Sequence, residues 1–385
     1  MKIALHDNGL HLRFAPLTLT RPVGNLRMGI FTNDERWKMY LPAEEISYAT
    51  EAYLSGKFPS STDEVVEVNG SIIPNEDLVA AVCGLSDHEV LFLNGIWIAR
   101  KGNATINVEF KGATPTILSQ RWHLYQKNDE VLRQDFELIT AGRVSQKLSS
   151  SNRVIGDENL VFLEEGAVVE GAILNTKTGP IYIGKDAEIM EGSIVRGPLA
   201  MNEHSALKMG TKIYGAVTLG PHCKVGGEVS NVVFQAFSNK GHDGFLGNAL
   251  IGEWCNLGAD TNTSNLKNNY GMVKTYSYES KKEEQTDIQF MGVCMGDHSK
   301  CGINTMFNTA TVVGVSANVY GAGFPDKLVD SFTWGGPEGT VPFKFDKAIE
   351  YANNMMNRRG MELSEAEIEI MKKISLDSGF KDSRH

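Results

Sequence analysis

The sequence predicts an α/β domain over residues 1–145, followed by a parallel β-solenoid over residues 154–323. Two observations lead to this fold class. A six-residue repeat of apolar positions runs through the middle of the chain, and short apolar strands separated by polar, turn-rich segments precede it. A polar, serine-rich stretch at 146–153 predicts a linker between the two parts. Beyond the repeat, residues 324–385 predict a loop and a short helical tail.

The repeat is clearest between residues 183 and 225. Apolar side chains recur at every sixth position, namely Ile183, Ile189, Val195, Met201, Leu207, Ile213, Leu219 and Val225. Small side chains follow most of them four positions later, at Ala187, Ser193, Ser205, Thr211 and Cys223. This period matches neither an α-helix nor a simple alternating strand. It is typical of a parallel β-helix, in which each hexad forms a short strand and a turn.

The same spacing predicts further coils on both sides of this stretch. A first set comprises Ile155, Val161, Ala167 and Ile173, a short middle set comprises Ile251 and Leu257, and a last set comprises Met295, Cys301, Phe307, Val313 and Val319. Two segments, at about 230–247 and 263–290, interrupt the repeat. Insertions leave a solenoid as loops on one face, where ligands often bind.

The bulk composition excludes several classes of partner. The net charge of −10 argues against nucleic acid, because the phosphate backbone attracts basic surfaces. The sequence contains no apolar run long enough for a spanning helix, and its start does not resemble a signal peptide. Its five cysteines are scattered, with no Cys-x-x-Cys pair. We therefore expect a cytoplasmic protein with reduced thiols and no membrane partner.

Four segments outside the repeat predict regular structure. Residues 2–6 and 89–99 predict strands of the α/β domain, and the second is apolar enough to be buried. Residues 344–358 and 364–374 predict two helices at the end of the chain. Ser364 followed by Glu367 is the pattern of a capping box, which marks the start of the second helix.

The segment 239–265 contains the candidate chemistry of the solenoid. His242 lies between Gly241 and Gly244, and asparagines surround it at positions 239, 248, 256, 262 and 265. Histidine titrates near neutrality and can accept a proton from an amine or hydroxyl. Asparagine amides supply donors and acceptors suited to sugar hydroxyls. The alternative is structural, because a lone histidine is often an ordinary surface or core residue and asparagines form ladders at solenoid turns.

This segment resembles the acetyltransferase part of the bifunctional bacterial enzymes that make UDP-N-acetylglucosamine. The resemblance is carried by Lys240-Gly241-His242, by 245–252 (FLGNALIG), by 256–261 (NLGADT) and by Ser264-Asn265-Leu266. That family combines a nucleotidyltransferase domain with a left-handed parallel β-helix, which trimerises and forms its active sites between subunits. The resemblance therefore implies a left-handed solenoid and a homotrimer with His242 near a subunit interface.

The resemblance also implies roles for individual residues. His242 matches the general base that deprotonates a sugar amine for attack on acetyl-CoA. The positions that match substrate-binding residues are Asn256, Asn265 and Lys212, and Ala259 matches a position that contacts acetyl-CoA. The family's phosphate-binding lysine and two substrate tyrosines are replaced here by Ser230, Phe245 and Leu266. Lys274, in the second interruption, is a candidate replacement for the lysine.

The start of the chain resembles the nucleotide-binding segment of sugar nucleotidyltransferases. Residues 12–22 read LRFAPLTLTRP, which places Arg13, Thr18 and Arg21 where that family contacts the nucleotide. Of the family's glycine-rich loop, residues 6–9 keep a single glycine. Ile96 stands where the family has a metal-binding aspartate, and an isoleucine cannot bind Mg²⁺.

Together, the two resemblances imply a sugar-nucleotide enzyme that acts on small molecules. Its solenoid would transfer acetyl from acetyl-CoA to an amino sugar phosphate. Its first domain would join a sugar-1-phosphate to UTP or another nucleotide with the help of Mg²⁺. Two alternatives stay open: an acyltransferase whose first domain only binds a nucleotide sugar, and a non-enzymatic trimeric scaffold or sensor.

Overall fold

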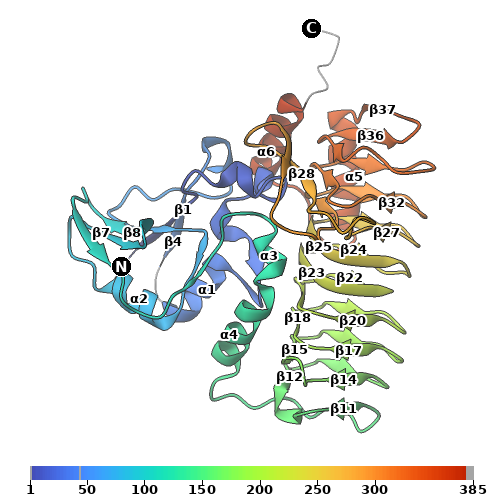
Figure 1. The fold of residues 1–385 in the computed structure, drawn as a ribbon, viewed down its shortest axis with the longest axis horizontal. Coiled ribbons are helices and arrows are strands. Elements are labelled where there is room, and N and C mark those ends of the chain that lie inside the picture. The colour runs from blue at the N-terminus through green and yellow to red at the C-terminus, as the bar shows by residue number, and fades with distance from the viewer. Residues whose placement is uncertain (1, 43–44, 379–385) are drawn as a thin grey trace.

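A computed structural model of the chain describes residues 2–42 and 45–378. An α/β domain lies beside a long solenoid of stacked parallel strands, and two helices lie against its last coils (Figure 1). The predicted combination of an α/β domain, a parallel β-solenoid and a helical tail is confirmed. Among the described residues, no helix combines the length and hydropathy that a membrane span requires.

The first domain is built on a mixed six-stranded sheet. Its strand order is β4 (Ile46–Ala49), β1 (Ile3–His6), β5 (Val66–Asn69), β8 (Ile96–Lys101), β7 (Glu89–Leu93) and β9 (Ile106–Glu109). The helices of this part are α1 (Asn33–Tyr40), α2 (Glu76–Cys83), α3 (His123–Gln126) and α4 (Asn128–Thr140). Two short antiparallel pairs complete it, β2 (Arg27–Met28) with β3 (Phe31–Thr32) and β6 (Ile72–Ile73) with β10 (Thr116–Ile117).

The single strand predicted over 89–99 is wrong. The segment forms a β-hairpin, with β7 and β8 paired antiparallel around Asn94 and Gly95. Both turn residues have positive φ, +50° and +79°, as a two-residue hairpin turn requires. Asn-Gly was therefore the signal for a turn inside the apolar run.

The solenoid has three faces, each a ladder of parallel strands. Face 1 comprises β11 (Arg153–Ile155), β14 (Ile173–Asn175), β17 (Ile194–Arg196), β20 (Lys212–Tyr214), the first parts of β23 (Glu228–Ala236) and β25 (Phe245–Glu253), and the pair β27 (Asn262–Thr263) and β32 (Met306–Phe307). Face 2 comprises β12 (Val161–Leu163), β15 (Ile181–Ile183), β18 (Leu199–Met201), β21 (Val217–Leu219), the last parts of β23 and β25, β30 (Cys294–Met295), β33 (Val312–Val313) and β35 (Leu328–Val329). Face 3 comprises β13 (Val168–Val169), β16 (Glu188–Ile189), β19 (Ala206–Leu207), β22 (Lys224–Val225), β24 (Asn239–Lys240), β26 (Asn256–Leu257), β31 (Lys300–Cys301), β34 (Asn318–Val319) and β36 (Thr333–Gly336).

The six-residue positions point into the solenoid as predicted. All eight from Ile183 to Val225, the middle pair and the whole last set are buried in one continuous core. The first set is out of register, because Ile155 and Ile173 are only half-buried while Leu174 points inward. Leu163 pairs with Ile183, so this coil is two residues longer than three hexads, and the period cannot be extended back across its loop.

The solenoid extends beyond both predicted boundaries. Parallel pairing continues past Gly323 through β35 and β36, and β37 (Gly339–Pro342) then folds back antiparallel onto β36. At the other end, the segment expected to be a linker lies against the first coil. Asn152 Nδ2 donates to the backbone oxygen of Val169 (2.7 Å), and the backbone nitrogen of Gln146 donates to that of Leu163 (2.8 Å).

The first predicted interruption, 230–247, is wrong, because β23, β24 and β25 continue the coils through it. The six-residue spacing fails there because the coils are shorter than three hexads and because an inward position is occupied by Lys240 instead of an apolar residue. The second interruption is a true insertion. It forms the hairpin β28 (Lys274–Ser277) and β29 (Lys282–Gln285), which reaches the first domain through a 2.7 Å hydrogen bond from Arg121 to Thr275.

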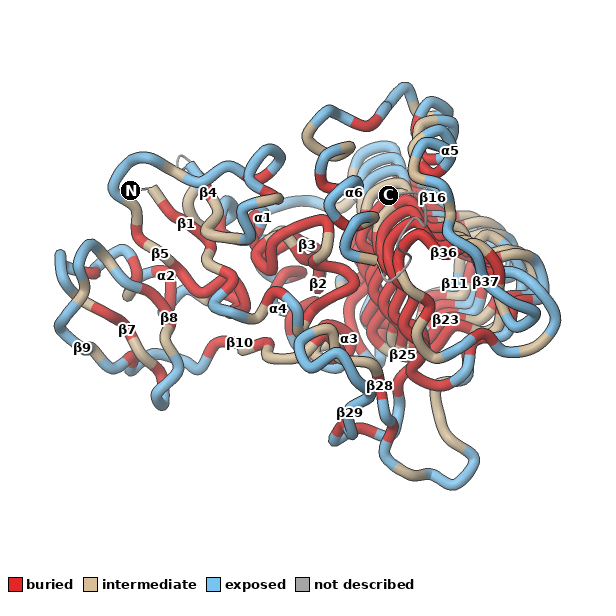
Figure 2. The backbone as a smooth tube through the Cα atoms, turned by 90° about the horizontal axis from the view of Figure 1, so that it is seen from above, coloured by how far each residue is buried: buried red, intermediate tan, exposed pale blue. Residues whose placement is uncertain are grey.

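The first domain covers face 2 of the solenoid. On β17 and β20 of face 1 only the middle residue is buried, whereas all three residues of β15, β18 and β21 on face 2 are buried. The outward side chains of Phe162, Tyr182 and Ala200 pack against Leu132 and Phe136 of α4. Seen along the solenoid axis, the buried chain therefore continues from the coils into the first domain (Figure 2).

The chain ends in the helices α5 (Phe345–Asn357) and α6 (Glu365–Asp377), close to the predicted positions. Ser364 and Glu367 form the predicted capping box at the start of α6. Met356 and Leu363 pack with Trp254 of the solenoid, which fixes the two helices at the corner between faces 2 and 3.

Candidate functional site

His242 projects from a tight turn at the corner where face 3 meets face 1. The turn connects β24 to β25, and the His242 side chain is exposed. Gly244 has a φ of +117°, and a Cβ atom there would lie 2.2 Å from the backbone oxygen of Thr261 in the next coil. Only glycine fits this close approach, so the backbone leaving the histidine is tightly constrained.

Lys240 supports this turn from inside the solenoid. It pairs with Val225 and occupies the same inward position, fully buried. Its Nζ donates to the backbone oxygens of His242 (2.8 Å), Asp243 (3.2 Å) and Gly226 (3.3 Å). Burial, partly offset by the charge of Asp243, lowers the pKa of the Lys240 ammonium to about 8.

His242 stands at the rim of a cavity of about 1150 Å³, here called the His242 cavity. One wall is a column of polar side chains on face 3, where Lys224, Asn239, Asn256 and Lys300 are paired residue by residue across four adjacent strands. Because such strands stack about 4.8 Å apart, the column spans roughly 14 Å. It is a continuous polar surface long enough to follow an extended ligand.

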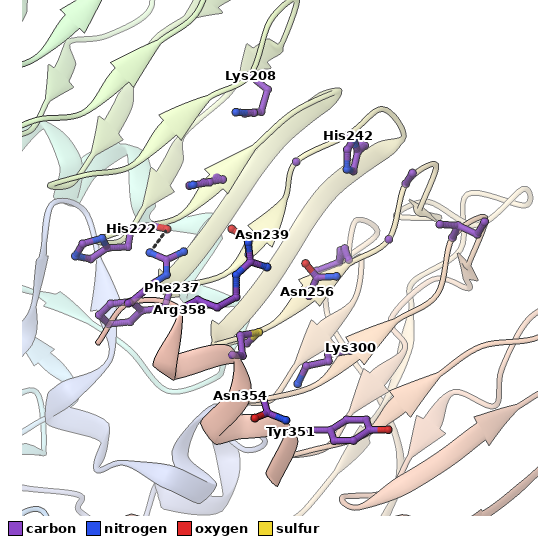
Figure 3. Close-up of a pocket in the computed structure, with 18 of the residues that line it drawn as sticks. Lys208, His222, Phe237, Asn239, His242, Asn256, Lys300, Tyr351, Asn354 and Arg358 are labelled. Carbon is purple, nitrogen blue, oxygen red and sulfur yellow. Dashed lines mark hydrogen bonds between the residues drawn. The ribbon is translucent and has the colours of Figure 1, made fainter. Parts of the chain in front are cut away.

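Helix α5 forms the opposite wall. Tyr351, Asn354 and Arg358 face the solenoid column across the cavity, while His242 lies at the far rim (Figure 3). Arg359, one residue further on, donates to the backbone oxygen of His222 at 3.1 Å. The helical tail thus completes the cavity, which the coils alone would leave open.

The lining of the His242 cavity is strongly basic. It includes the cations Lys208, Lys224, Lys300, Arg358 and Arg359 and the histidines His204, His222 and His242, and no carboxylate is among the described residues that line it. Lys300 Nζ donates to the backbone oxygen of His298 at 3.0 Å. Burial lowers the pKa of this ammonium group. In a chain with a net charge of −10, this concentration of positive charge indicates an anionic ligand.

An aromatic ladder runs along the neighbouring corner, between faces 2 and 3. His204, His222, Phe237, Trp254 and His298 occupy equivalent turn positions, with φ between +55° and +60°. Successive rings stack at centroid distances of 4.7, 5.0, 4.2 and 6.5 Å. The first three rings, those of His204, His222 and Phe237, line the His242 cavity. The stacked rings therefore give the solenoid side of this cavity a rigid base.

Arg359 joins the middle of the ladder to α5, and the last ring of the ladder, His298, is buried. The Arg359 guanidinium lies 5.6 Å from the ring centre of Phe237 and 5.9 Å from that of Trp254, which holds the end of α5 against the ladder. His298 is buried, and its Nδ1 has no hydrogen-bond partner among the described residues. Burial and the charge of Lys300 lower the pKa of His298 to about 3, so it is neutral at physiological pH.

Residues 3–144 match the family model described as sugar nucleotidyl transferase. Among curated proteins, the bifunctional protein GlmU of Acaryochloris marina is 23% identical over 290 residues, which cover 74% of this chain and 51% of that protein. The bifunctional protein GlmU of Methanocaldococcus jannaschii is 33% identical over 93 residues, covering 24% of this chain and 22% of that protein. The chain thus resembles GlmU proteins but spans about half their length or less.

Matches among solved structures include the UDP-N-acetylglucosamine acyltransferase from Campylobacter jejuni. It is 14% identical and covers 60% of this chain and 97% of its own, with a TM-score of 0.29. The polysialic-acid-specific acetyltransferase NeuO covers 50% of this chain and 87% of its own at 13% identity, with a TM-score of 0.29.

The structure brings together three of the residues that the GlmU resemblance singled out. His242, Asn256 and Ala259 all line the His242 cavity. Asn265 lines a different cavity, of about 600 Å³, together with Asn248 and Phe290. Lys212 is exposed on β20 of face 1, and Lys274 is exposed on the inserted hairpin. Neither lysine is among the residues that line the His242 cavity.

The structure also reveals basic residues that the sequence analysis missed. Lys224, Lys300 and Arg358 come from three distant segments and meet only in the folded chain. A signal for the two lysines was present, because each immediately precedes an inward apolar position of the repeat and must therefore point outward on face 3. No comparable pattern marked Arg358.

The residues that match the nucleotide-binding segment lie against the solenoid. Arg21 is buried between the domains, where Nη1 lies 2.6 Å from Glu253 Oε1 and Nη2 lies 2.5 Å from Asp297 Oδ2. Burial opposes its charge, but Asp297 and Glu253 together raise the pKa of the guanidinium. Thr18 is buried and donates to the backbone oxygen of His11. Only Arg13 is partly exposed, and it pairs with Glu279 of the insertion at 3.0 Å.

The first domain offers a poor fit to the Mg²⁺ that nucleotidyl transfer would need. Ile96 begins β8 directly after the hairpin turn, and its side chain has no donor atom. Within residues 2–42 and 45–378, no three histidine, cysteine, aspartate or glutamate side chains are grouped as metal ligands. We therefore assign no step to a metal in this domain.

Proposed function

We propose that the solenoid is an acyltransferase that moves an acetyl group from acetyl-CoA to the amine of an amino sugar phosphate. The observation that carries this proposal is the position of His242 at the rim of a cavity lined by cations and amides. Coenzyme A carries a diphosphate and a 3′-phosphate, and the lysine and arginine side chains suit such a ligand. The amides of Asn239 and Asn256 suit its amide arm or the sugar hydroxyls.

In this proposal His242 is the general base. Its imidazole accepts a proton from the sugar amine as the amine nitrogen attacks the thioester carbonyl. The carbon–sulfur bond then breaks, and the proton passes to the departing thiolate, so that an amide and a free thiol result. The backbone of Ala259, stacked beside the His242 turn in the next coil, borders the position where the thioester would lie.

The test follows thiol release from acetyl-CoA with glucosamine-1-phosphate as the first acceptor. We expect turnover by the wild type, loss of turnover in His242→Ala, and unchanged coenzyme A binding in that variant. Lys300→Met should weaken coenzyme A binding, whereas Lys282→Met on the inserted hairpin, outside the cavity, should not. Full turnover by His242→Ala, or coenzyme A binding that ignores Lys300, would reject the assignment.

For the first domain we propose a supporting role rather than nucleotidyl transfer. The burial of Thr18 and Arg21 and the position of Ile96 favour the alternative in which this domain docks or binds a nucleotide sugar. A parallel assay with N-acetylglucosamine-1-phosphate, UTP and Mg²⁺ measures pyrophosphate. Thiol release without pyrophosphate is the expected result, and rapid pyrophosphate release would restore the bifunctional interpretation.

We further propose that the solenoid forms a homotrimer through the corner that carries His242. Face 2 is covered by the first domain, which leaves faces 1 and 3 for contact. Met209 and Ile303 stand on the same corner, 71% and 72% exposed, and Ile303 lies in the coil beyond Ala259. Light scattering gives the mass of the particle, and an Ile303→Asp variant should reduce it to that of one chain if this corner is the interface.

A further inference from the structure

Two stacked histidines, His204 and His222, line the His242 cavity at the corner between faces 2 and 3. They occupy equivalent turn positions in adjacent coils, and their ring centres lie 4.7 Å apart with the planes inclined by 20°. His222 stacks in turn on Phe237 at 5.0 Å. Figure 3 shows His222 beside Phe237, with His242 on the other side of the cavity. The two imidazoles, here called the histidine pair, are therefore held in place away from the candidate base.

The ring nitrogens of the histidine pair are available to a ligand. Among the described residues, neither ring makes a hydrogen bond. The contact between His204 Nδ1 and Asp186 Oδ2 is long, at 3.9 Å, and both side chains are close to half exposed. Solvent screens an ion pair of this kind, so it does not occupy the pair.

Positive charges surround the histidine pair on the cavity side. The charged groups that face it are Asp186 and Glu203 of the turns, Lys208 and Lys224 of the coils, and Arg358 and Arg359 at the end of α5. The four cations line the cavity, whereas neither carboxylate is among the described residues that do. Burial, followed by the charges of Arg359, His204 and Lys224, lowers the pKa of His222, and Glu203 offsets only part of this effect. Without a ligand, His222 is therefore mostly neutral at pH 7.

A bound phosphate group reverses this balance. An anion within about 4–6 Å favours the protonated form of an imidazole, and the surrounding cations that repel a proton attract a phosphate. Two imidazolium rings stacked at 4.7 Å would repel each other, so the histidine pair accepts one added proton rather than two. Phosphate binding and proton uptake then favour each other by the same free energy.

We propose that the histidine pair, with Lys208 and Lys224, is a phosphate-binding subsite that takes up one proton from solvent when the phosphate binds. The ligand class is a phosphate ester, and coenzyme A is the phosphate ester that the proposed function supplies. The inference rests on the proposed function only for this choice of ligand, since neither histidine of the pair carries a step of acyl transfer.

The experiment measures ligand binding to the full chain by titration calorimetry at pH 8, 7 and 6. Each titration is repeated in two buffers of different ionisation enthalpy, which gives the number of protons taken up. The probes are coenzyme A, adenosine 3′,5′-bisphosphate, which lacks the acyl arm, and pantetheine, which lacks phosphate. We expect both phosphate esters to bind the wild type with uptake approaching one proton, and pantetheine to bind without uptake.

The test variant combines His204→Gln with His222→Gln, which keeps hydrogen-bonding side chains but removes both proton sites. Between pH 8 and pH 6 the wild type should gain about three- to tenfold in affinity relative to this variant. The comparison cancels the titration of the ligand's own phosphate groups, which is the same for both proteins. His88→Gln is the matched control, because His88 is also a turn residue with positive φ but does not line the cavity.

The His242→Ala variant shows which histidine takes up the proton. Uptake that is lost in the double variant but retained in His242→Ala and His88→Gln supports the inference. It is overturned if the double variant takes up as many protons as the wild type, if uptake disappears in His242→Ala instead, or if neither phosphate ester binds. Circular dichroism verifies the fold of each variant. The imidazole NMR signals of the wild type give a check without substitution, because two of them should titrate at higher pH when adenosine 3′,5′-bisphosphate is bound.

Failure of the proposed function gives a different result. Adenosine 3′,5′-bisphosphate that binds with proton uptake, in a protein that releases no thiol from acetyl-CoA, supports the subsite and rejects acyl transfer. Thiol release without any proton uptake on binding overturns the subsite and leaves acyl transfer in place.

Discussion

The ammonium of Lys240 lies inside the solenoid, 2.8 Å from the backbone oxygen of His242. In the adjacent coils the same inward position holds Val225 and Leu257, whose side chains only fill the core. Here a buried cation donates to three backbone oxygens of neighbouring turns. The core residue thus connects directly to the turn that presents the candidate base.

Replacing Lys240 by methionine tests this connection. Methionine has similar length but no donor, so the turn loses its internal support while the core stays filled. We expect turnover in the acyl-transfer assay to fall roughly 10- to 100-fold, because a displaced catalytic group loses much of its effect. Coenzyme A binding should be retained. Leu257→Met is the control, because it places a methionine at the same inward position of the next coil. Equal turnover in the two variants would show that Lys240 only fills space.

His298 predicts an acid-sensitive fold. Its pKa in the folded chain, about 3, lies below the ordinary value of 6.5, so the unfolded chain binds the extra proton first as the pH falls. The free energy of unfolding is therefore unaffected by His298 above pH 6.5. Between pH 6.5 and pH 3 it falls by up to about 1.4 kcal/mol per pH unit. His298→Phe keeps a ring beside Trp254 without the proton site. Urea unfolding at pH 7, 5 and 4 should show a smaller acid loss in this variant, and parallel curves would contradict the assignment.

The ion pairs of Arg21 predict a large effect on stability. Arg21→Met would leave the buried carboxylate of Asp297 and the largely buried one of Glu253 without their partner, which costs about 3–5 kcal/mol. Arg13→Met is the matched control, because the exposed pair of Arg13 with Glu279 contributes at most about 1 kcal/mol. Denaturant unfolding measures both. Similar small losses would mean that Arg21 is not an interdomain anchor.

The register of the first coils can be tested with two neighbouring residues. Leu174 is buried in the solenoid core, whereas Ile173 is only half-buried on face 1. Leu174→Ala should destabilise the chain by about 2–5 kcal/mol through the cavity it leaves, and Ile173→Ala should cost clearly less. The reverse order in chemical denaturation would restore the register predicted from the six-residue period.

Several parts of the candidate site could be predicted from the sequence because they depend on local pattern. His242, Asn256 and Ala259 lie in adjacent coils of one repeat, so knowing the repeat places them on one side of the solenoid. Asn265 shows the limit of this reasoning. It lies only nine residues beyond Asn256, but the chain has turned a corner between them, and the two side chains line different cavities.

What the sequence determined by itself is the solenoid and its capped tail. The inward position is apolar in nearly every coil, with Lys240 as an exception, so the period can be recognised in the sequence, and the capping box at Ser364 is equally local. Only the tertiary structure decided that the first domain docks on face 2, which buries Arg21 against Asp297, and that Arg358 joins Lys300 across one cavity. These contacts join segments far apart in the chain and depend on the shapes and charges of whole surfaces, which no short pattern encodes.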